Sequence, residues 1–223
     1  MKRSEINALI SGAKELLHSR GFALPPFAFW TPREWTAKGS DCDEIRKCRL
    51  GWDVTDFGSG DFPKTGLVIF TVRNGSRILP EFAGKTYAEK ILIVRENQVT
   101  PLHFHAAKRE DIICRSGKLA FRLFKRSPSG ELDQGDVDVS MDGVRRTVKA
   151  GEVLVVAPGE SVTLEPYMIH EFWAPEGAGT AVLGEVSSVN DDETDNYFLK
   201  PTGRFPEIEE DEPPLHLLCT EYP

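Results

Sequence analysis

From Gly51 onward the chain is a succession of short runs of β-forming residues separated by turn residues. Runs such as TGLVIFTVRNG, KLAFRLFKRS and EVLVVAPG are bounded by Gly, Pro, Asn or Asp, and they recur at intervals of about a dozen residues. Leu119, Phe121 and Leu123 alternate with charged residues, as expected for a half-buried strand. Asp142-Gly143 is a two-residue hairpin signal. This series predicts an antiparallel all-β sandwich or barrel rather than an α/β sheet.

The first 50 residues differ from this pattern and predict a helical and irregular extension that packs on the barrel. Apolar residues recur at helical spacing over 4–20, where Ser4 can cap the helix and Gly21 ends it. Thr31 followed by Pro32 predicts a short capped helix over 32–38. The sequence therefore divides into the extension (1–50), the barrel (51–200) and an acidic, proline-rich tail (201–223). We expect the acidic run from Glu207 to Glu212 to be solvated, and less strongly that Leu215–Leu218 packs on the barrel or a partner chain.

The bulk properties exclude several classes of protein. A chain of 223 residues fits one sizeable domain. Its net charge of −8 argues against sequence-independent binding of nucleic acid, which requires Lys and Arg to neutralise phosphates. There is no apolar run long enough for a membrane span, and MKRSEINALISG lacks the features of a signal peptide. The cysteines (Cys42, Cys48, Cys114 and Cys219) form no regular framework, so we expect reduced thiols in a cytoplasmic protein.

The segment PLHFHAAKREDIICRSG carries the strongest chemical signal. On a strand, His103 and His105 project from one face while Phe104 points to the other, and a turn at AAKR can bring Glu110 back over the two imidazoles. With His170 these residues offer imidazole and carboxylate ligands to Mn, Fe, Co, Ni or Zn, with positions left open for substrate. A polar strand face is the simpler interpretation of a lone His pair, but the joint pattern favours a catalytic metal. The remaining histidines, His18 and His216, are expected in solvent.

These residues resemble the two motifs of the cupin superfamily. The first motif, a His-x-His pair followed by Glu and then Gly, is matched by His103, His105, Glu110 and Gly117. The second is matched by GEVLVVAPGESVTLEPYMIH, with its Pro-Gly at 158–159 and its late His170, although the gap before His170 is longer than in the minimal pattern. The resemblance implies a double-stranded β-helix (jelly-roll barrel) in which both motifs converge on one metal ion at the barrel mouth.

Nearly the whole chain resembles the D-lyxose ketol-isomerase family of cupin sugar isomerases. The similar stretches are MKRSEIN, FAFWTPREW, TPLHFHAAKREDII and GEVSSVNDDETDNYF. The resemblance implies an Mn²⁺-dependent homodimer that interconverts D-lyxose and D-xylulose and sometimes accepts D-mannose, which would give D-fructose. Co²⁺, Fe²⁺ and Zn²⁺ also suit the donor set.

Isomerisation through a metal-stabilised enediolate needs a carboxylate base and a second group that handles the oxygen protons. The catalytic candidates are Lys108, Glu110 and Glu185, and the choice of base among them stays open, as does proton transfer against hydride shift. Glu185 stands among apolar residues and so is expected to line the pocket. The substrate-binding candidates are Lys90, Asp191 and Arg204, whereas Glu171 is expected to point away from the metal.

Two other functions fit the same ligand set. A cupin dioxygenase would use Fe and consume oxygen, and a non-catalytic sugar-binding cupin would bind a ligand without turnover. An acidic pocket residue such as Glu185 favours the isomerase, because an oxygenase needs no base for a carbon proton.

Overall fold

The computed structural model describes residues 1–223, which form many strands and few helices. The helical elements are α1 (Arg3–Ser19), η1 (Pro26–Phe29), α2 (Pro32–Trp35), η2 (Ser40–Cys42), α3 (Asp43–Lys47) and η3 (Pro80–Phe82). The strands are β1 (Gly51–Thr55), β2 (Leu67–Arg73), β3 (Tyr87–Val94), β4 (His103–Phe104), β5 (Glu110–Ser116), β6 (Leu119–Arg126), β7 (Leu132–Asp133), β8 (Val137–Met141), β9 (Val144–Val148), β10 (Leu154–Val156), β11 (Ser161–Leu164), β12 (Ile169–Trp173), β13 (Ala181–Ser188) and β14 (Tyr197–Phe198). None of the helices combines the length and the apolar content needed to span a bilayer.

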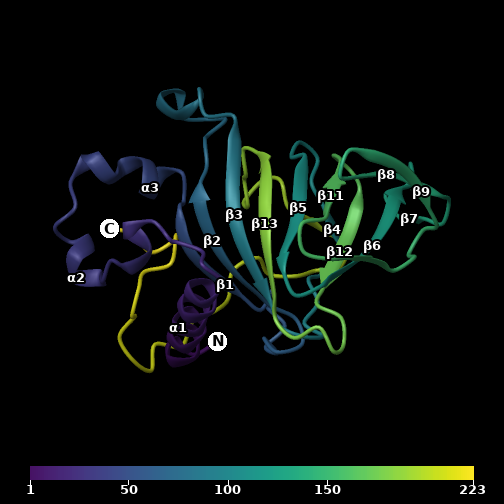
Figure 1. Cartoon of the computed structure of the whole chain (residues 1–223). Helices are drawn as coiled ribbons and strands as arrows, with labels where there is room; N and C mark the ends of the chain where they lie inside the picture. The colour runs from purple at the N-terminus through teal and green to yellow at the C-terminus, as the bar shows by residue number, and fades with distance from the viewer.

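Two antiparallel sheets face each other and form the barrel (Figure 1). The larger sheet has the order β1-β2-β3-β13-β5-β11-β8-β9, and the smaller one has the order β10-β6-β12-β4-β14, with β7 beside β6. The Asp142-Gly143 hairpin is present between β8 and β9, and both of its residues have the positive φ (52° and 79°) that such a turn requires. The all-β cupin-type fold predicted from the sequence is therefore confirmed.

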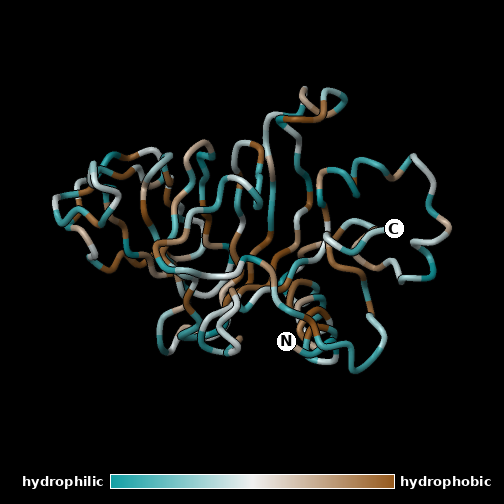
Figure 2. The backbone as a smooth tube through the Cα atoms, turned by 180° about the vertical axis from the view of Figure 1, so that it is seen from behind, coloured by the Kyte–Doolittle hydropathy of each residue, from teal (hydrophilic) through white to brown (hydrophobic).

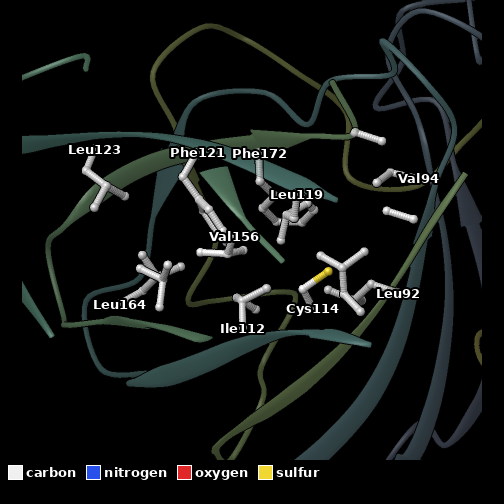
Figure 3. Packing of buried hydrophobic residues seen from close by; sticks show 14 of the residues in the cluster. Leu92, Val94, Ile112, Cys114, Leu119, Phe121, Leu123, Val156, Leu164 and Phe172 are labelled. Carbon is white, nitrogen blue, oxygen red and sulfur yellow. The ribbon is translucent and has the colours of Figure 1, made fainter. Parts of the chain in front are cut away.

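The barrel interior is filled by apolar side chains that both sheets contribute. Figure 3 shows Leu119, Phe121 and Phe172 of the smaller sheet facing Ile112 and Cys114 of the larger one. The predicted alternation in β6 is confirmed in part: Leu119, Phe121 and Leu123 are buried and Arg122 and Lys125 are exposed, but Ala120 and Phe124 are buried as well. All four cysteines are free thiols and buried.

Helix α1 packs with one apolar face against the outer side of the larger sheet. Ile6, Ile10 and Leu17 are fully buried in a second cluster with residues of β1, β2 and β3. Seen from behind, α1 and the adjoining strands carry long apolar stretches (Figure 2). The helix starts at Arg3, and its N-cap is Lys2. Ser4 is therefore not the cap: it lies inside the first turn, and its hydroxyl donates to Asp211.

The short second helix has the predicted cap. Thr31 and Glu34 form a complete capping box at the start of α2, with Pro32 at the first helical position. The helix ends at Trp35 instead of reaching Lys38, and the last predicted residues form turns.

The C-terminal segment runs back along α1 (Figure 1). Its acidic residues are exposed, as expected, but they also bind the helix: Glu210 pairs with the buried Arg3, and Glu212 accepts a hydrogen bond from Asn7. Leu218 is buried beside β1. The expectation that His216 lies in solvent is wrong, because this segment buries it between α1 and the loop that carries Trp30.

Candidate active site

The two sequence motifs meet on neighbouring strands. His103 in β4 is the direct register partner of His170 in β12, and His105 follows β4 immediately. One ring nitrogen from each of the three lies within 4.8 Å of those of the other two. The long gap before His170 contains the whole of β11 and a tight turn, so the extra residues lead His170 to this position.

Backbone carbonyls fix the orientation of all three imidazoles. The Nδ1 atoms of His103 and His170 lie 2.8 Å and 2.9 Å from the carbonyl oxygens of Pro101 and Met168, and Nδ1 of His105 contacts the carbonyl of Asp195. A carbonyl can only accept, so each Nδ1 carries the proton and each Nε2 keeps its lone pair. Three lone pairs therefore point into one small space.

Glu110 at the start of β5 completes this group. Its Oε1 lies 3.5 Å from Nε2 of His105 and 3.4 Å from Nε2 of His170. Burial opposes ionisation of Glu110, but the Lys108 ammonium outweighs it and holds the pKa of this carboxyl well below its usual value. Burial also lowers the pKa of His103 well below its usual value, and burial together with Lys108 lowers that of His105 to about 3. The protonation states are those that metal ligands require.

The residues fit a divalent metal ion. Nε2 of His170 is buried and has no hydrogen-bond partner, which is costly unless something accepts its lone pair. Three neutral imidazoles and one carboxylate are a donor set for a borderline transition metal, and the adjoining cavity leaves room for exchangeable ligands.

A chain of alternating charges leads away from the histidines. Lys108 lies in the turn between β4 and β5, with its Nζ 2.5 Å from Oε2 of Glu110 and 3.2 Å from Oε1 of Glu185. Nζ of Lys90 lies 3.6 Å from the same Oε1 and donates to Asn190 at 2.6 Å. The lysines and both carboxylates are at most 5% exposed. They offer a proton acceptor and proton donors that are almost fully buried.

This cavity offers about 50 Å³ to the centre of a water-sized sphere, within about 460 Å³ of space between atoms that includes open solvent. Phe57, Phe172 and Phe198 supply an apolar wall beside the histidines. Its other charged or amide-bearing side chains, apart from Glu110, are Lys90, Lys108, Glu185, Asp192, Asn196 and Arg204. Arg204 comes from the C-terminal segment, where its Nη2 binds Asp53 at 2.6 Å and Asp192 at 3.2 Å. Its Nη1 is buried without a partner.

Asp191 does not line this cavity, in contrast to the expectation from its sequence neighbourhood. Its carboxylate accepts from the backbone N–H groups of Glu193 and Thr194, each at 3.1 Å, and so closes the local turn. The next residue, Asp192, reaches the cavity instead. Sequence reasoning also missed Asn190 and Asp195, whose only signal was their place in the polar run NDDETDN. Glu171 points away as predicted and pairs with Arg122 at 2.9 Å.

Comparison with known families decides the assignment. A family model described as D-lyxose isomerase matches residues 1–222. The chain belongs to the D-lyxose isomerase family.

Other members of the D-lyxose isomerase family align with the whole chain. A D-lyxose/D-mannose isomerase of Serratia proteamaculans is 47% identical over 100% of this chain and 98% of its own length. One of Escherichia coli O157:H7 is 45% identical with the same coverage. Among solved structures, the L-ribose isomerase of Cellulomonas parahominis superposes with a TM-score of 0.63 at 16% identity, over 94% of this chain and 98% of its own, and it supports the fold. The protein is therefore an enzyme, a sugar isomerase of the D-lyxose/D-mannose isomerase type.

Proposed function

We propose that this protein is a divalent-metal-dependent aldose–ketose isomerase that interconverts D-lyxose with D-xylulose and D-mannose with D-fructose. The observation that carries the proposal is the group of three imidazole Nε2 atoms and one ionised carboxylate, next to a second buried carboxylate held by two lysines. We propose Mn²⁺ as the native metal, held by His103, His105, Glu110 and His170. When bound, the cation would polarise the sugar carbonyl and stabilise negative charge on oxygen.

Glu185 is the base in this proposal. Oε1 of Glu110 faces Nε2 of His105 and of His170, where the proposed metal would lie, and its Oε2 contacts Lys108. Glu185 differs, because Lys108, Lys90 and Ser187 all contact its Oε1 and leave Oε2 without a protein partner. Oε2 of Glu185 therefore takes the proton from the carbon next to the carbonyl and returns it to the neighbouring carbon.

Lys108 manages the oxygen protons. Its ammonium contacts two carboxylates, so it can donate a proton to the carbonyl oxygen as negative charge develops there and recover one from the hydroxyl of the neighbouring carbon. Lys90 keeps Glu185 in place and is itself held by Asn190. The unpartnered Nη1 of Arg204 is a donor for a sugar hydroxyl at the far side of the cavity.

The proposal is tested with metal-stripped protein reconstituted separately with Mn²⁺, Co²⁺, Fe²⁺ or Zn²⁺ and supplied with D-lyxose or D-mannose. We expect ketose formation only in reconstituted samples, fastest with Mn²⁺. Replacing His105 with Ala removes one of four ligands and should abolish metal-dependent turnover. Glu171→Gln is the matched control, because Glu171 follows His170 directly yet points to Arg122. Undiminished turnover in stripped protein, or in the His105 variant, would refute the proposed site.

The route of the carbon-bound hydrogen gives an independent test. If Glu185 carries the proton, turnover in D₂O should place deuterium on the carbon next to the ketose carbonyl, because a carboxylate proton exchanges with solvent. A hydride shift would leave the product unlabelled there, and that result would remove Glu185 from the proposed role.

The homodimer is a further part of the proposal, and it rests on the family resemblance. Light scattering coupled to size-exclusion chromatography should give twice the 24.9 kDa mass of one chain. A mass of one chain would contradict it.

A further inference from the structure

The turn that joins the two parts of the first motif is held by a residue from far along the chain. The backbone N–H groups of Ala106, Ala107 and Lys108 donate to the carboxylate of Asp195 at 2.7, 3.0 and 2.9 Å. Asp195 is 4% exposed, so these hydrogen bonds to a charged acceptor are shielded from water. Asp195 is the side chain that accepts from these three backbone N–H groups of the turn between His105 and Glu110.

The same residue also contacts a metal-ligand candidate. The backbone carbonyl of Asp195 accepts the Nδ1 proton of His105, which sets the tautomer and the direction of Nε2. Asp195 therefore touches the first motif twice: its carbonyl orients the His105 ring, and its carboxylate fixes the turn from which Lys108 reaches Glu110 and Glu185.

We infer that Asp195 is a positioning residue, which sets the direction of His105 and the reach of Lys108 by holding the 106–108 turn through its carboxylate. The inference rests on the proposed function only in that His105 is taken as a metal ligand. Asp195 is not a ligand itself, because both of its oxygens face backbone N–H groups. Loss of its side chain should loosen the turn and lower metal affinity while the barrel stays folded.

Two further contacts hold Asp195, and neither involves the 106–108 turn. Its own N–H donates to the carbonyl of Asp191 at 3.1 Å, within the turn that the Asp191 carboxylate closes. Nη1 of Arg77 lies 3.8 Å from Oδ2 of Asp195, and its Nη2 donates to Val189. The 189–196 segment is thus also held by contacts that do not involve the 106–108 turn.

The test uses the full-length variants Asp195→Asn and Asp195→Ala. The Asn amide keeps one acceptor oxygen but turns an NH₂ group toward the turn, whereas Ala removes every acceptor. In metal-free protein, we expect the amides of 106–108 to exchange with solvent about tenfold faster in the Ala variant. Titration with Co²⁺ followed by its visible spectrum should show affinity lower by about 10-fold for Asn and about 100-fold for Ala, with a changed band shape. At saturating metal, kcat should fall more than KM changes.

Asp142→Ala is the matched control. Asp142 also accepts from a backbone N–H, that of Ser161 at 2.8 Å, but it lies in the β8–β9 hairpin outside the cavity. Its loss should lower the melting temperature without changing Co²⁺ affinity.

The outcomes separate this inference from the proposed function. Wild-type affinity for Co²⁺ and wild-type exchange at 106–108 in both Asp195 variants would overturn the positioning role. A wild-type protein that binds no divalent metal would overturn the proposed metal site. In that case faster amide exchange at 106–108, with a shifted His105 Nδ1 proton resonance, still supports positioning by Asp195, and unchanged signals overturn it.

Discussion

The two halves of the barrel interior follow the same strand geometry but contain opposite kinds of side chain. On β3, β13 and β5 the residues that face inward alternate with period two. Toward one end of the barrel they are Lys90, Glu185 and Glu110, all lining the cavity. Toward the other end the same strand faces carry Val94, Leu183 and Cys114, all in the apolar core.

The register shows how sharp this boundary is. Glu185 pairs with Lys90, whereas Leu183, two residues earlier, pairs with Leu92 and Cys114. Leu92 and Ile112 border both regions, since they belong to the core and also line the cavity. The rigid apolar half therefore fixes the strands on which the charged half is mounted, which favours precise placement of reacting groups.

The largest expected effect comes from changing one residue on each side of this boundary in β13. Glu185→Gln keeps the shape of the side chain but removes the proposed base, so kcat should fall by about 10²–10⁴-fold. Leu183→Ala should instead cost about 2–5 kcal/mol of stability and leave kcat per folded molecule near that of the wild type. Steady-state kinetics and urea unfolding of both variants measure the contrast. Equal losses of kcat in the two variants would show that the boundary has no functional meaning.

Removing the metal should affect both turnover, which depends on the charged half of the barrel interior, and the stability of the fold, with the larger effect on turnover. A chelator should abolish turnover and also lower the free energy of unfolding, by about 2.7 kcal/mol if the metal had been present at 100 times its Kd. His170→Ala should remove this difference between holo and apo protein, because it deletes the ligand with the orphaned Nε2. Calorimetry with and without chelator measures both quantities, and a melting temperature that ignores the chelator in the wild type would contradict the prediction.

Much of the site could be predicted from the sequence, because its first half is local. His103, His105 and Glu110 lie within one strand–turn–strand unit, where the period of two and a short turn determine their relation. His170 was harder to place, and the intervening β11 explains its distance from the Pro-Gly turn. Glu185 stood out as a charge among apolar residues of one strand.

The rest depends on how distant segments fold back onto the barrel. Asp192 and Asp195 belong to an ordinary polar turn sequence, and the hydrogen bonds that the Asp195 carboxylate accepts come from a turn some 90 residues earlier in the chain. Asp192 lines the cavity and Asp191 does not. The two are neighbours in a loop, and a loop has no regular period from which the direction of each side chain could be predicted. His216 looked solvated because nothing local shows that the C-terminal segment covers α1.

The smallest expected effect comes from His216, a buried titratable residue outside the barrel interior. Changing it should alter the stability of the protein but not its turnover, in contrast to changes in the charged half of the interior. Nδ1 of His216 donates to the Trp30 carbonyl at 2.9 Å, and its Nε2 lies 2.8 Å from Nζ of Lys14. Burial, with help from Lys14 and against the Trp30 bond and Glu34, lowers the pKa of His216. The unfolded chain, in which a histidine has a pKa of about 6.5, therefore binds the proton first as the pH falls.

It follows that this site contributes stability above about pH 6.5 that is progressively lost on acidification, with a slope of at most about 1.4 kcal/mol per pH unit for one proton. His216→Gln cannot titrate and should show a shallower pH dependence of unfolding than the wild type between about pH 6.5 and 5. Urea unfolding of the wild type and of the His216→Gln variant is measured in the presence of chelator. Both proteins contain the barrel histidines, so the contribution of these residues cancels in the difference between the two. Turnover of the metal-loaded variant at neutral pH should equal that of the wild type, since His216 lines no part of the cavity. Identical pH slopes would mean that the C-terminal segment opens before His216 is protonated, and reduced turnover would mean that this segment controls the site through Arg204.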